Sequence, residues 1–138
     1  MQSGRATMTL DQPQCFVLHE HFASHHHFDF RLEHDGVLKS WAVPKGLPEK
    51  SGDRRLAIAV EDHPLDYIGF QGTIPEGQYG AGKVTIKDTG TYDLLIWSNE
   101  RIEVLLNGQF FSGKYVLIRF KKAGDKEWLV LRAKEPVL

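Results

Sequence analysis

The chain has 138 residues, an ordinary length for one domain with a single hydrophobic core. Hydrophobic residues make up 41% and charged residues 25% of the chain, and no apolar stretch reaches the roughly 18 residues of a membrane helix, so we expect a soluble globular protein with no membrane partner. The net charge of -1 lacks the basic excess of proteins that coat nucleic acid without sequence preference, so any nucleic-acid contact should be short, such as one strand end.

The N-terminal residues give little sign of targeting. Met1 to Leu10 lack the apolar core of a secretory signal, and Cys15 is the only cysteine, so no disulfide can form within the chain. A reducing, cytoplasmic setting is therefore expected. No repeat or low-complexity tract divides the sequence, so we predict one domain over residues 1–138, with residues 1–14 as a flexible N-terminal arm.

Short runs with β character recur between Gly, Pro, Asn and Asp residues, and few stretches could form a helix of normal length. The expected strands are Cys15 to Glu20, His27 to Glu33, Val37 to Val43, Arg55 to Glu61, Lys83 to Asp88, Tyr92 to Trp97, Ile102 to Leu106, Tyr115 to Lys121 and Glu127 to Ala133. This pattern predicts an all-β fold, a compact antiparallel β-barrel of about eight or nine short strands with at most short helices.

Two dipeptides and one ambiguous segment refine this prediction. Asp35-Gly36 and Asn107-Gly108 fit type I′ hairpin turns, so each predicts antiparallel neighbours. Ser98 to Leu106 has an alternative as a short helix, with Ser98 or Asn99 as its cap.

The most informative run alternates as a strand does. His27, Asp29 and Arg31 share one face, opposite Phe28, Phe30 and Leu32. We expect the polar row to face the barrel interior or its open concave side. A second row of this type contains small residues that would leave room for a ligand; its members are Arg55, Ala57, Ala59 and Glu61.

The polar row suits a metal ion. Residues i and i+2 of a strand lie roughly 7 Å apart at the backbone and share a face, so His27 and Asp29 can converge on one ion. His21 is our choice for the third ligand, and this mixed nitrogen and oxygen set suits manganese, iron or zinc. Beside a metal, Arg31 is interpreted as a clamp for phosphate or carboxylate rather than as a surface salt-bridge residue. Ordinary surface or core positions are the more usual explanation for the remaining histidines nearby, which are His19, His25, His26 and His34.

Two further segments have structural explanations as well as chemical ones. The segment from Val60 to Tyr67 is a strand that enters a turn at Pro64, yet His63 and Tyr67 could supply a proton donor and a hydroxyl to a ligand. The segment from Ile74 to Gly82 is a tight glycine-containing loop. It is not a phosphate-binding P-loop, because it lacks the Gly-Lys-Ser/Thr context.

Seven stretches of the chain occur in an order that is typical of a known family. They are His21, His27 to Glu33, Gly36 to Gly46, Val60 to Tyr67, Ile74 to Gly82, Gly113 to Arg119 and Glu127 to Arg132. Together they resemble the 3′-phosphoesterase domain of the end-joining DNA ligase D. The resemblance covers nearly the whole chain.

The resemblance implies a β-barrel that binds Mn2+, with Co2+ or Zn2+ as other possible ions, and that trims the 3′ end of DNA or of an RNA-tailed primer. The family removes a terminal ribonucleoside by phosphodiester cleavage and then hydrolyses the 3′-phosphate to a 3′-hydroxyl. By position, the metal ligands would be His21, His27 and Asp29. The residues around the reacting phosphate would be Arg31, His63 and Tyr67, with Lys45 and Arg55 as further basic groups.

The resemblance also implies partners. We expect a monomer at the nucleoid of a prokaryotic cytoplasm that acts on primer-template 3′ ends. Its expected protein partners are a DNA ligase, a polymerase or a Ku-type end-joining protein. Arg5 and Asp11 cannot be matched to the Arg- and acid-containing arm that the family uses for ribonucleoside removal. The resemblance therefore supports phosphomonoesterase action more firmly than diesterase action.

Two other functions remain open from the sequence. A non-haem iron oxygenase would use His27, Asp29 and His63 as its facial triad. A non-catalytic module that recognises nucleic-acid ends would stack bases on Trp41, Tyr67 or Tyr79.

Overall fold

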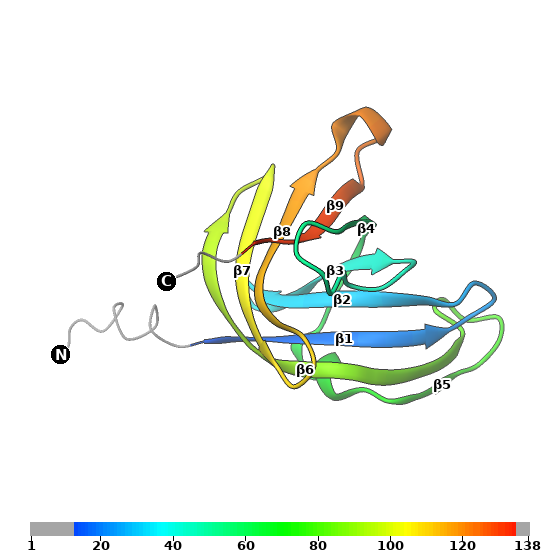
Figure 1. Cartoon of the computed structure of the whole chain (residues 1–138). Helices are drawn as coiled ribbons and strands as arrows, with labels where there is room; N and C mark the ends of the chain where they lie inside the picture. Colours follow the sequence, from blue (N-terminus) through cyan, green and yellow to red (C-terminus); the bar gives the residue numbers. More distant parts are fainter. Residues whose placement is uncertain (1–12, 135–138) are drawn as a thin grey trace.

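The computed structural model describes residues 13–134 as nine strands and two short 3-10 helices, drawn in Figure 1. The elements are β1 (Gln14–Phe22), β2 (His27–His34), β3 (Val37–Val43), β4 (Arg54–His63), η1 (Leu65–Gly69), β5 (Gly72–Ile74), β6 (Gly82–Trp97), β7 (Arg101–Gly108), β8 (Ser112–Arg119), η2 (Lys121–Ala123) and β9 (Glu127–Arg132). No α-helix occurs between residues 13 and 134. The predicted all-β class is confirmed.

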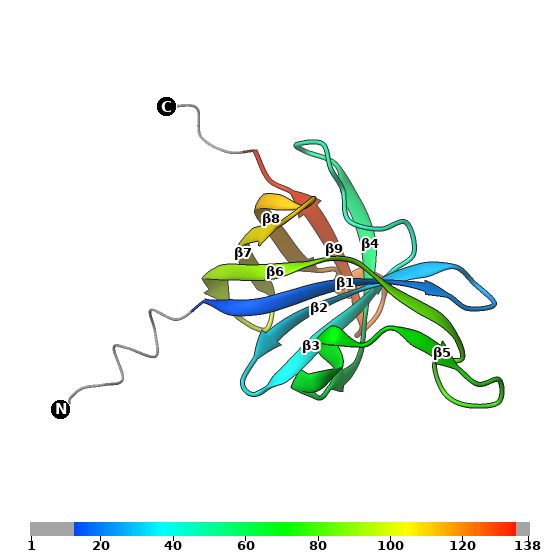
Figure 2. The ribbon, with the colours of Figure 1, turned by 90° about the horizontal axis from the view of Figure 1, so that it is seen from below.

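Eight of the strands close into a barrel. Their order is β1-β2-β3-β4-β9-β8-β7-β6, and β6 pairs back with β1, with every pair antiparallel. The short strand β5 is the ninth, paired only with the first residues of β6, and Figure 2 shows it at one end of the barrel. Closure leaves the eight ring strands without an unpaired edge.

The barrel interior is apolar. Phe30 and Leu32 of β2 are fully buried in one core cluster that also takes side chains from β1, β3, β4, β6, β7, β8 and β9. Because side chains alternate along a strand, the polar row of His27, Asp29 and Arg31 stands on the outer wall. Of the two predicted orientations, the concave outer side is therefore the correct one, and the barrel interior is not.

The second predicted row points the other way. Ala57 is fully buried in the barrel core, and Ala59 packs against it. The expectation that these alanines leave room for a ligand is wrong, because their small side chains fit beside the large aromatic residues of the core. Val60, from the opposite face of β4, instead lines the outer cleft.

Two expected strands prove to be one. The segments Lys83 to Asp88 and Tyr92 to Trp97 are both parts of β6, which runs without a break through Gly90. A Cβ atom on Gly90 would lie 2.3 Å from the carbonyl oxygen of Asn107 on the neighbouring strand. This glycine therefore permits a close approach between strands, at a point where one expected strand had ended and the next had not begun.

The hairpin predictions are half right. Asp35 and Gly36 both have positive φ, 53° and 82°, and join antiparallel β2 and β3 as a type I′ turn requires. Asn107 and Gly108 lie inside β7, and the turn to antiparallel β8 comes just after them, closed by the Gly108 amide donating to the Phe111 carbonyl at 3.0 Å. The helical alternative for Ser98 to Leu106 is wrong, because β7 begins at Arg101.

The chain between β4 and β6 leaves the barrel and covers part of its outer wall. It contains η1, β5 and the glycine loop, of which the sequence analysis predicted only the loop. Of the predicted N-terminal arm, residues 1–12 lie outside the described residues, and Gln14 is already the first residue of β1. Within residues 13–134, no helix is long and apolar enough to cross a membrane.

Candidate active site

A cleft of about 1110 Å³ lies on the outer wall of the barrel, beneath the segment that connects β4 to β6. Its polar lining includes His21 on β1, the polar row of β2, and His63 and Tyr67 at the end of β4 and in η1. The lining also has the polar residues Ser24, Thr73 and Glu76. The structure thus brings together six of the eight predicted site residues.

Three of these side chains converge on one point. His21 and His27 are cross-strand partners in the β1–β2 pair, so their side chains stand next to each other on the same face. The Nδ1 atom of His21 lies 3.3 Å from the Nε2 atom of His27, which lies 3.3 Å from Oδ1 of Asp29. One potential ligand atom from each of the three residues lies within 4.8 Å of the others, a spacing that suits a single cation.

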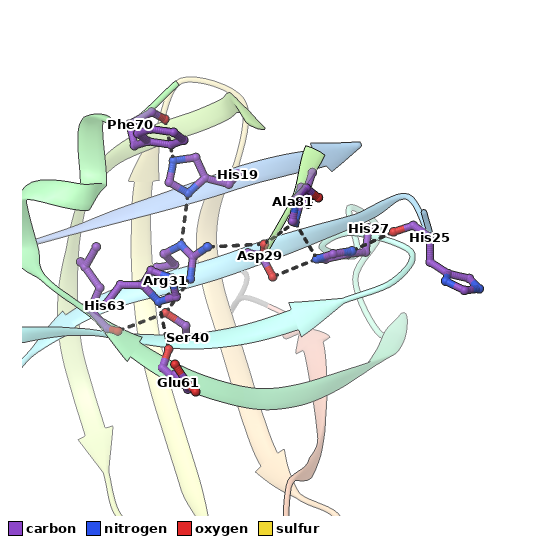
Figure 3. Close-up of polar contacts among 12 residues, drawn as sticks. His19, His25, His27, Asp29, Arg31, Ser40, Glu61, His63, Phe70 and Ala81 are labelled. Carbon is purple, nitrogen blue, oxygen red and sulfur yellow. Dashed lines mark hydrogen bonds and ion pairs between the residues drawn. The ribbon is translucent and has the colours of Figure 1, made fainter. Parts of the chain in front are cut away.

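The far nitrogen of each histidine ring contacts a backbone carbonyl. Nε2 of His21 donates to the carbonyl of Ala81 at 3.1 Å, and Nδ1 of His27 donates to the carbonyl of His25 at 2.9 Å. Figure 3 shows the His27 contact and the ring of His25, which points away from the cluster. When both rings are neutral, the lone pairs are on the two nitrogens that face each other, whereas without a metal Nε2 of His27 can carry a proton and donate it to Asp29. Metal-bound histidines use this arrangement, in which the other ring nitrogen is held by a hydrogen-bond acceptor.

The carboxylate between them stays ionised. Burial alone would raise the pKa of Asp29, but the hydrogen bond from His27 and the charge of Arg31 more than offset it, so the pKa lies below its usual value. The hydrogen bond with Asp29 in turn raises the pKa of His27 against the effect of burial. Asp29 therefore provides a negative charge for a cation at neutral pH.

Arg31 lies next to this group and is held on every side. The residue is only 3% exposed. Its Nε donates to Nδ1 of His19 at 3.2 Å, Nη1 donates to Oγ of Ser40 at 2.9 Å, and Nη2 lies 3.4 Å from Oδ2 of Asp29, as Figure 3 shows. The ring of Tyr67 lies 5.0 Å from the guanidinium carbon, within the range of a cation–π contact.

His19 anchors the arginine and is not part of the cation group. Its Nε2 donates to the carbonyl of Phe70 at 3.0 Å, which leaves Nδ1 free to accept from Arg31. Burial, followed by the charge of Arg31, lowers the pKa of His19 to about 4. The ring is therefore neutral at physiological pH, as an acceptor for a cationic guanidinium must be.

His63 reaches the cleft through a β-bulge. In the β3–β4 pair, Leu38 is opposite His63 but Ser40 is opposite Val60, so β4 has one extra residue. This irregularity turns His63 to the same side as Val60. Nδ1 of His63 lies 3.0 Å from the Glu61 carbonyl and 3.1 Å from Nη1 of Arg31. A neutral ring that donates from Nδ1 to this carbonyl keeps its lone pair on Nε2, and burial and then Arg31 lower the pKa of His63.

Lys45 and Arg55 do not line this cleft. They border a smaller groove of about 440 Å³ together with Pro44, Arg54 and Leu56. Nη1 of Arg55 donates to the carbonyls of Lys45 and Gly46. The structure thus places these two predicted basic groups together, apart from the cation group.

Several groups that fix the site were not predicted from the sequence. These are Ser40, His19 as the partner of Arg31, and the carbonyls of His25, Phe70 and Ala81. Only His19 had a sequence signal, since it lies two residues before His21 and so shares its face. Main-chain acceptors have no side-chain signature.

The alternative triad of an oxygenase does not form. Within residues 13–134, the three-residue group that could hold a cation contains His21 and not His63. Trp41 is not available to stack on a base, because it is 4% exposed and belongs to the barrel core.

Comparisons with known proteins identify the family of the chain. The family model for the DNA Ligase D 3'-phosphoesterase domain matches residues 19–119. The chain belongs to this family. It is 52% identical over 123 residues to the multifunctional non-homologous end joining DNA repair protein LigD of Mycobacterium tuberculosis H37Rv, and the match covers 86% of the chain and 16% of that protein.

Two other relatives carry closely similar names. The multifunctional non-homologous end joining protein LigD of Mycolicibacterium smegmatis is 44% identical over 131 residues, which cover 87% of the chain and 17% of the relative. The protein of that name from Pseudomonas aeruginosa is 45% identical over 126 residues, which cover 87% of the chain and 15% of the relative. The chain therefore matches only about a sixth of the length of these proteins, which is the part that corresponds to the phosphoesterase domain of the family.

Proposed function

We propose that this chain is a divalent-metal-dependent phosphoesterase that converts a DNA or RNA 3′-phosphate end into a 3′-hydroxyl end in non-homologous end joining. The observation that carries the proposal is the cluster of His21, His27 and Asp29, with both histidines held by backbone carbonyls, directly beside the buried Arg31. A cation site next to a fixed guanidinium suits a phosphate group, whose oxygens both groups can share.

His21, His27 and Asp29 are the residues that would hold the metal. Their donor set of two nitrogens and one carboxylate suits Mn2+, and also Co2+ or Zn2+. When bound, such an ion supplies Lewis-acid polarisation of a phosphate oxygen and acidifies a water molecule. Membership of the family and the position of Asp29 support the metal assignment; the choice of Mn2+ is our proposal.

Arg31 is assigned to a second phosphate oxygen. Its contacts to His19, Ser40 and Asp29 fix the plane of the guanidinium before substrate arrives. Donors that are already oriented stabilise charge in a transition state without reorganising during the reaction. Tyr67 packs against the guanidinium and limits its movement.

His63 is assigned to the leaving group. A phosphate dianion near the ring favours the imidazolium form, because a nearby opposite charge stabilises it. As water bonds to phosphorus and the bond from phosphorus to O3′ breaks, the imidazolium of His63 gives its proton to O3′. The proton lost by the attacking water leaves with solvent.

Lys45 and Arg55 are assigned to a phosphate other than the reacting one. Their groove is separate from the cleft and has three basic residues on its border, since Arg54 joins them. Such a groove suits the backbone of a strand whose end is in the cleft. We extend the same proposal to the removal of a terminal ribonucleoside. It also includes contacts with a ligase, polymerase or Ku-type partner at the nucleoid.

A mass-spectrometric assay tests the function directly. An oligonucleotide with a 3′-phosphate and one with a single terminal ribonucleotide are incubated with Mn2+, Co2+, Zn2+ or a chelator. We expect loss of one phosphate group from the first substrate with metal and none with the chelator. If metal-loaded protein retained this oligonucleotide intact over hours, the proposal would fail and an end-binding module would be favoured.

A further inference from the structure

The cleft has two chemically different halves. One half carries the charged groups of β1, β2 and β4, and the other is lined mainly by apolar or small residues, among them Phe22, Ile74, Pro75 and Tyr79, with Thr73 and Glu76 as its polar members. We propose that Tyr79, together with Phe22, stacks on the nucleobase of the strand's terminal nucleoside. This inference rests on the proposed function, since it assigns the part of the substrate that lies beside the reacting phosphate.

Tyr79 is available for such a contact. Its side chain is 74% exposed although it lines the cleft. The other cleft tyrosine, Tyr67, already stacks on Phe70 at 4.9 Å between ring centres and contacts His63 at 4.6 Å. Phe22 is 44% exposed, and one face of its ring stacks on His26 with an angle of 5°.

The backbone presents Tyr79 on a defined loop. Gly77 and Gly80 flank it with φ values of +88° and +78°, which side-chain-bearing residues rarely adopt. The amide of Ala81 donates to the carbonyl of Gln78 at 3.1 Å, and the carbonyl of Ala81 accepts from His21. The loop that carries Tyr79 is therefore attached directly to the cation group.

Tyr79 lines the same cleft as the buried Arg31, so an exposed aromatic ring and a fixed guanidinium are both available to one substrate. A nucleoside 3′-phosphate carries a planar ring and an anion on one sugar, which is the combination that the two halves of the cleft offer. Stacking on an exposed aromatic ring tolerates every base, since each has a π face.

The test combines a protein change with a substrate change. Wild type, Tyr79→Phe and Tyr79→Ala are compared on a 3′-phosphate oligonucleotide with a normal terminal base and on one whose terminal nucleoside is abasic. We expect Tyr79→Ala to raise KM about tenfold on the normal end, with a much smaller effect on the abasic end and with kcat little changed. Tyr79→Phe keeps the ring and should resemble wild type. The matched control is Phe110→Ala, an exposed aromatic in the β7–β8 turn that does not line the cleft.

A binding measurement keeps the inference separate from catalysis. Fluorescence of 2-aminopurine as the terminal base, next to a 3′-phosphate, should be quenched by wild type and Tyr79→Phe but not by Tyr79→Ala. If Tyr79→Ala affected both ends equally and left the quenching intact, the stacking inference would be overturned while the phosphoesterase function stood. If wild type released no phosphate from either end, the proposed function would fail, and the quenching result would still decide whether Tyr79 binds the base.

Discussion

The Nδ1 atom of His21 faces the Nε2 atom of His27 across 3.3 Å, and in the neutral rings each of these nitrogens carries a lone pair. Two lone pairs this close repel each other unless a metal cation lies beside them or a proton occupies one nitrogen, and the raised pKa of His27 beside Asp29 shows that Nε2 of His27 favours such a positive charge. Asp29 contributes negative charge to the same point, with Oδ2 3.6 Å from the His21 nitrogen. The protein thus holds in place an arrangement that a bound cation would stabilise.

Amide replacements should reveal which histidine nitrogen binds the metal. The side-chain oxygen of asparagine falls near the position of Nδ1, and that of glutamine near Nε2. We expect His21→Asn and His27→Gln to keep some Mn2+ binding, about 10 to 100-fold weaker than wild type, whereas His21→Ala and His27→Ala lose binding and phosphate release. Calorimetric titration with Mn2+ and a phosphate-release assay measure both effects.

The control for this series is His34→Gln, because His34 lies at the far end of β2 and stacks on Trp97. It should bind metal as wild type does. Equal affinities for His21→Asn and His21→Ala would show that Nδ1 of His21 is not a ligand atom.

Replacement of Arg31 by lysine should impair turnover without removing the metal. Lysine keeps the charge but loses the planar fork that contacts His19, Ser40 and Asp29 together. We expect kcat/KM for a 3′-phosphate oligonucleotide to fall on the order of 100-fold or more, as for loss of an oriented oxyanion donor. Retained Mn2+ affinity in the same variant separates this effect from ligand loss, and wild-type turnover in Arg31→Lys would contradict the assignment.

Acidification should destabilise the protein through His19. Its pKa in the folded state is about 4, below the unfolded value near 6.5, so the unfolded chain binds the proton more readily. Stability from this residue is fully present above about pH 6.5 and is lost as the pH falls toward 4, by on the order of 2 to 3 kcal/mol.

Urea unfolding at several pH values, with a chelator present, measures this loss. His19→Gln removes the titrating ring, so the pH dependence of its free energy of unfolding should be flatter than that of wild type. Parallel curves for the two proteins would contradict the assignment of the slope to His19.

Gly82 should tolerate no side chain. Its φ is +121°, and an added Cβ atom would lie 2.4 Å from the backbone carbonyl oxygen of Phe22. Gly82→Ala therefore adds a steric clash to the backbone strain, and we expect a loss of more than about 3 kcal/mol in the free energy of unfolding. Gly36→Ala is the control, since φ is +82° but nothing lies within 4 Å of its Cβ position, so about 1 to 2 kcal/mol is expected. Thermal and urea denaturation of both variants test the difference. Equal losses in the free energy of unfolding would show that the clash with the Phe22 carbonyl does not add to the backbone strain.

Strand periodicity predicted much of the fold and the central part of the site. The alternation of β2 placed His27, Asp29 and Arg31 on one face because this period is a local property of the chain. Which face is inside the barrel is a global property, decided by where the aromatic residues of all eight ring strands can pack together. The expectation that Ala57 and Ala59 leave room for a ligand was therefore wrong, because Ala57 belongs to the barrel core and Ala59 packs against it.

Other features depend on contacts between distant segments. The close approach at Gly90 and the bulge before His63 arise from pairing with neighbouring strands, so a single strand's sequence does not reveal them. His21 lies beside His27 because of the register between β1 and β2, which the sequence of neither strand reveals by itself. The positions of Lys45 and Arg55 in a second groove likewise result from the β3–β4 connection and its partners.

The outward orientation of the polar row affects how a nucleic-acid strand could reach the residues of the candidate active site. A catalytic centre inside a closed barrel would have to admit the strand end through an opening, which limits the thickness of the nucleic acid attached to that end. Here the groups assigned to the reaction by the proposed function stand on the external wall, next to the segment between β4 and β6. Under that proposal, a nucleic acid would rest alongside the molecule while only its last nucleotide enters the cleft, and the length of the remaining polymer would place no demand on the barrel.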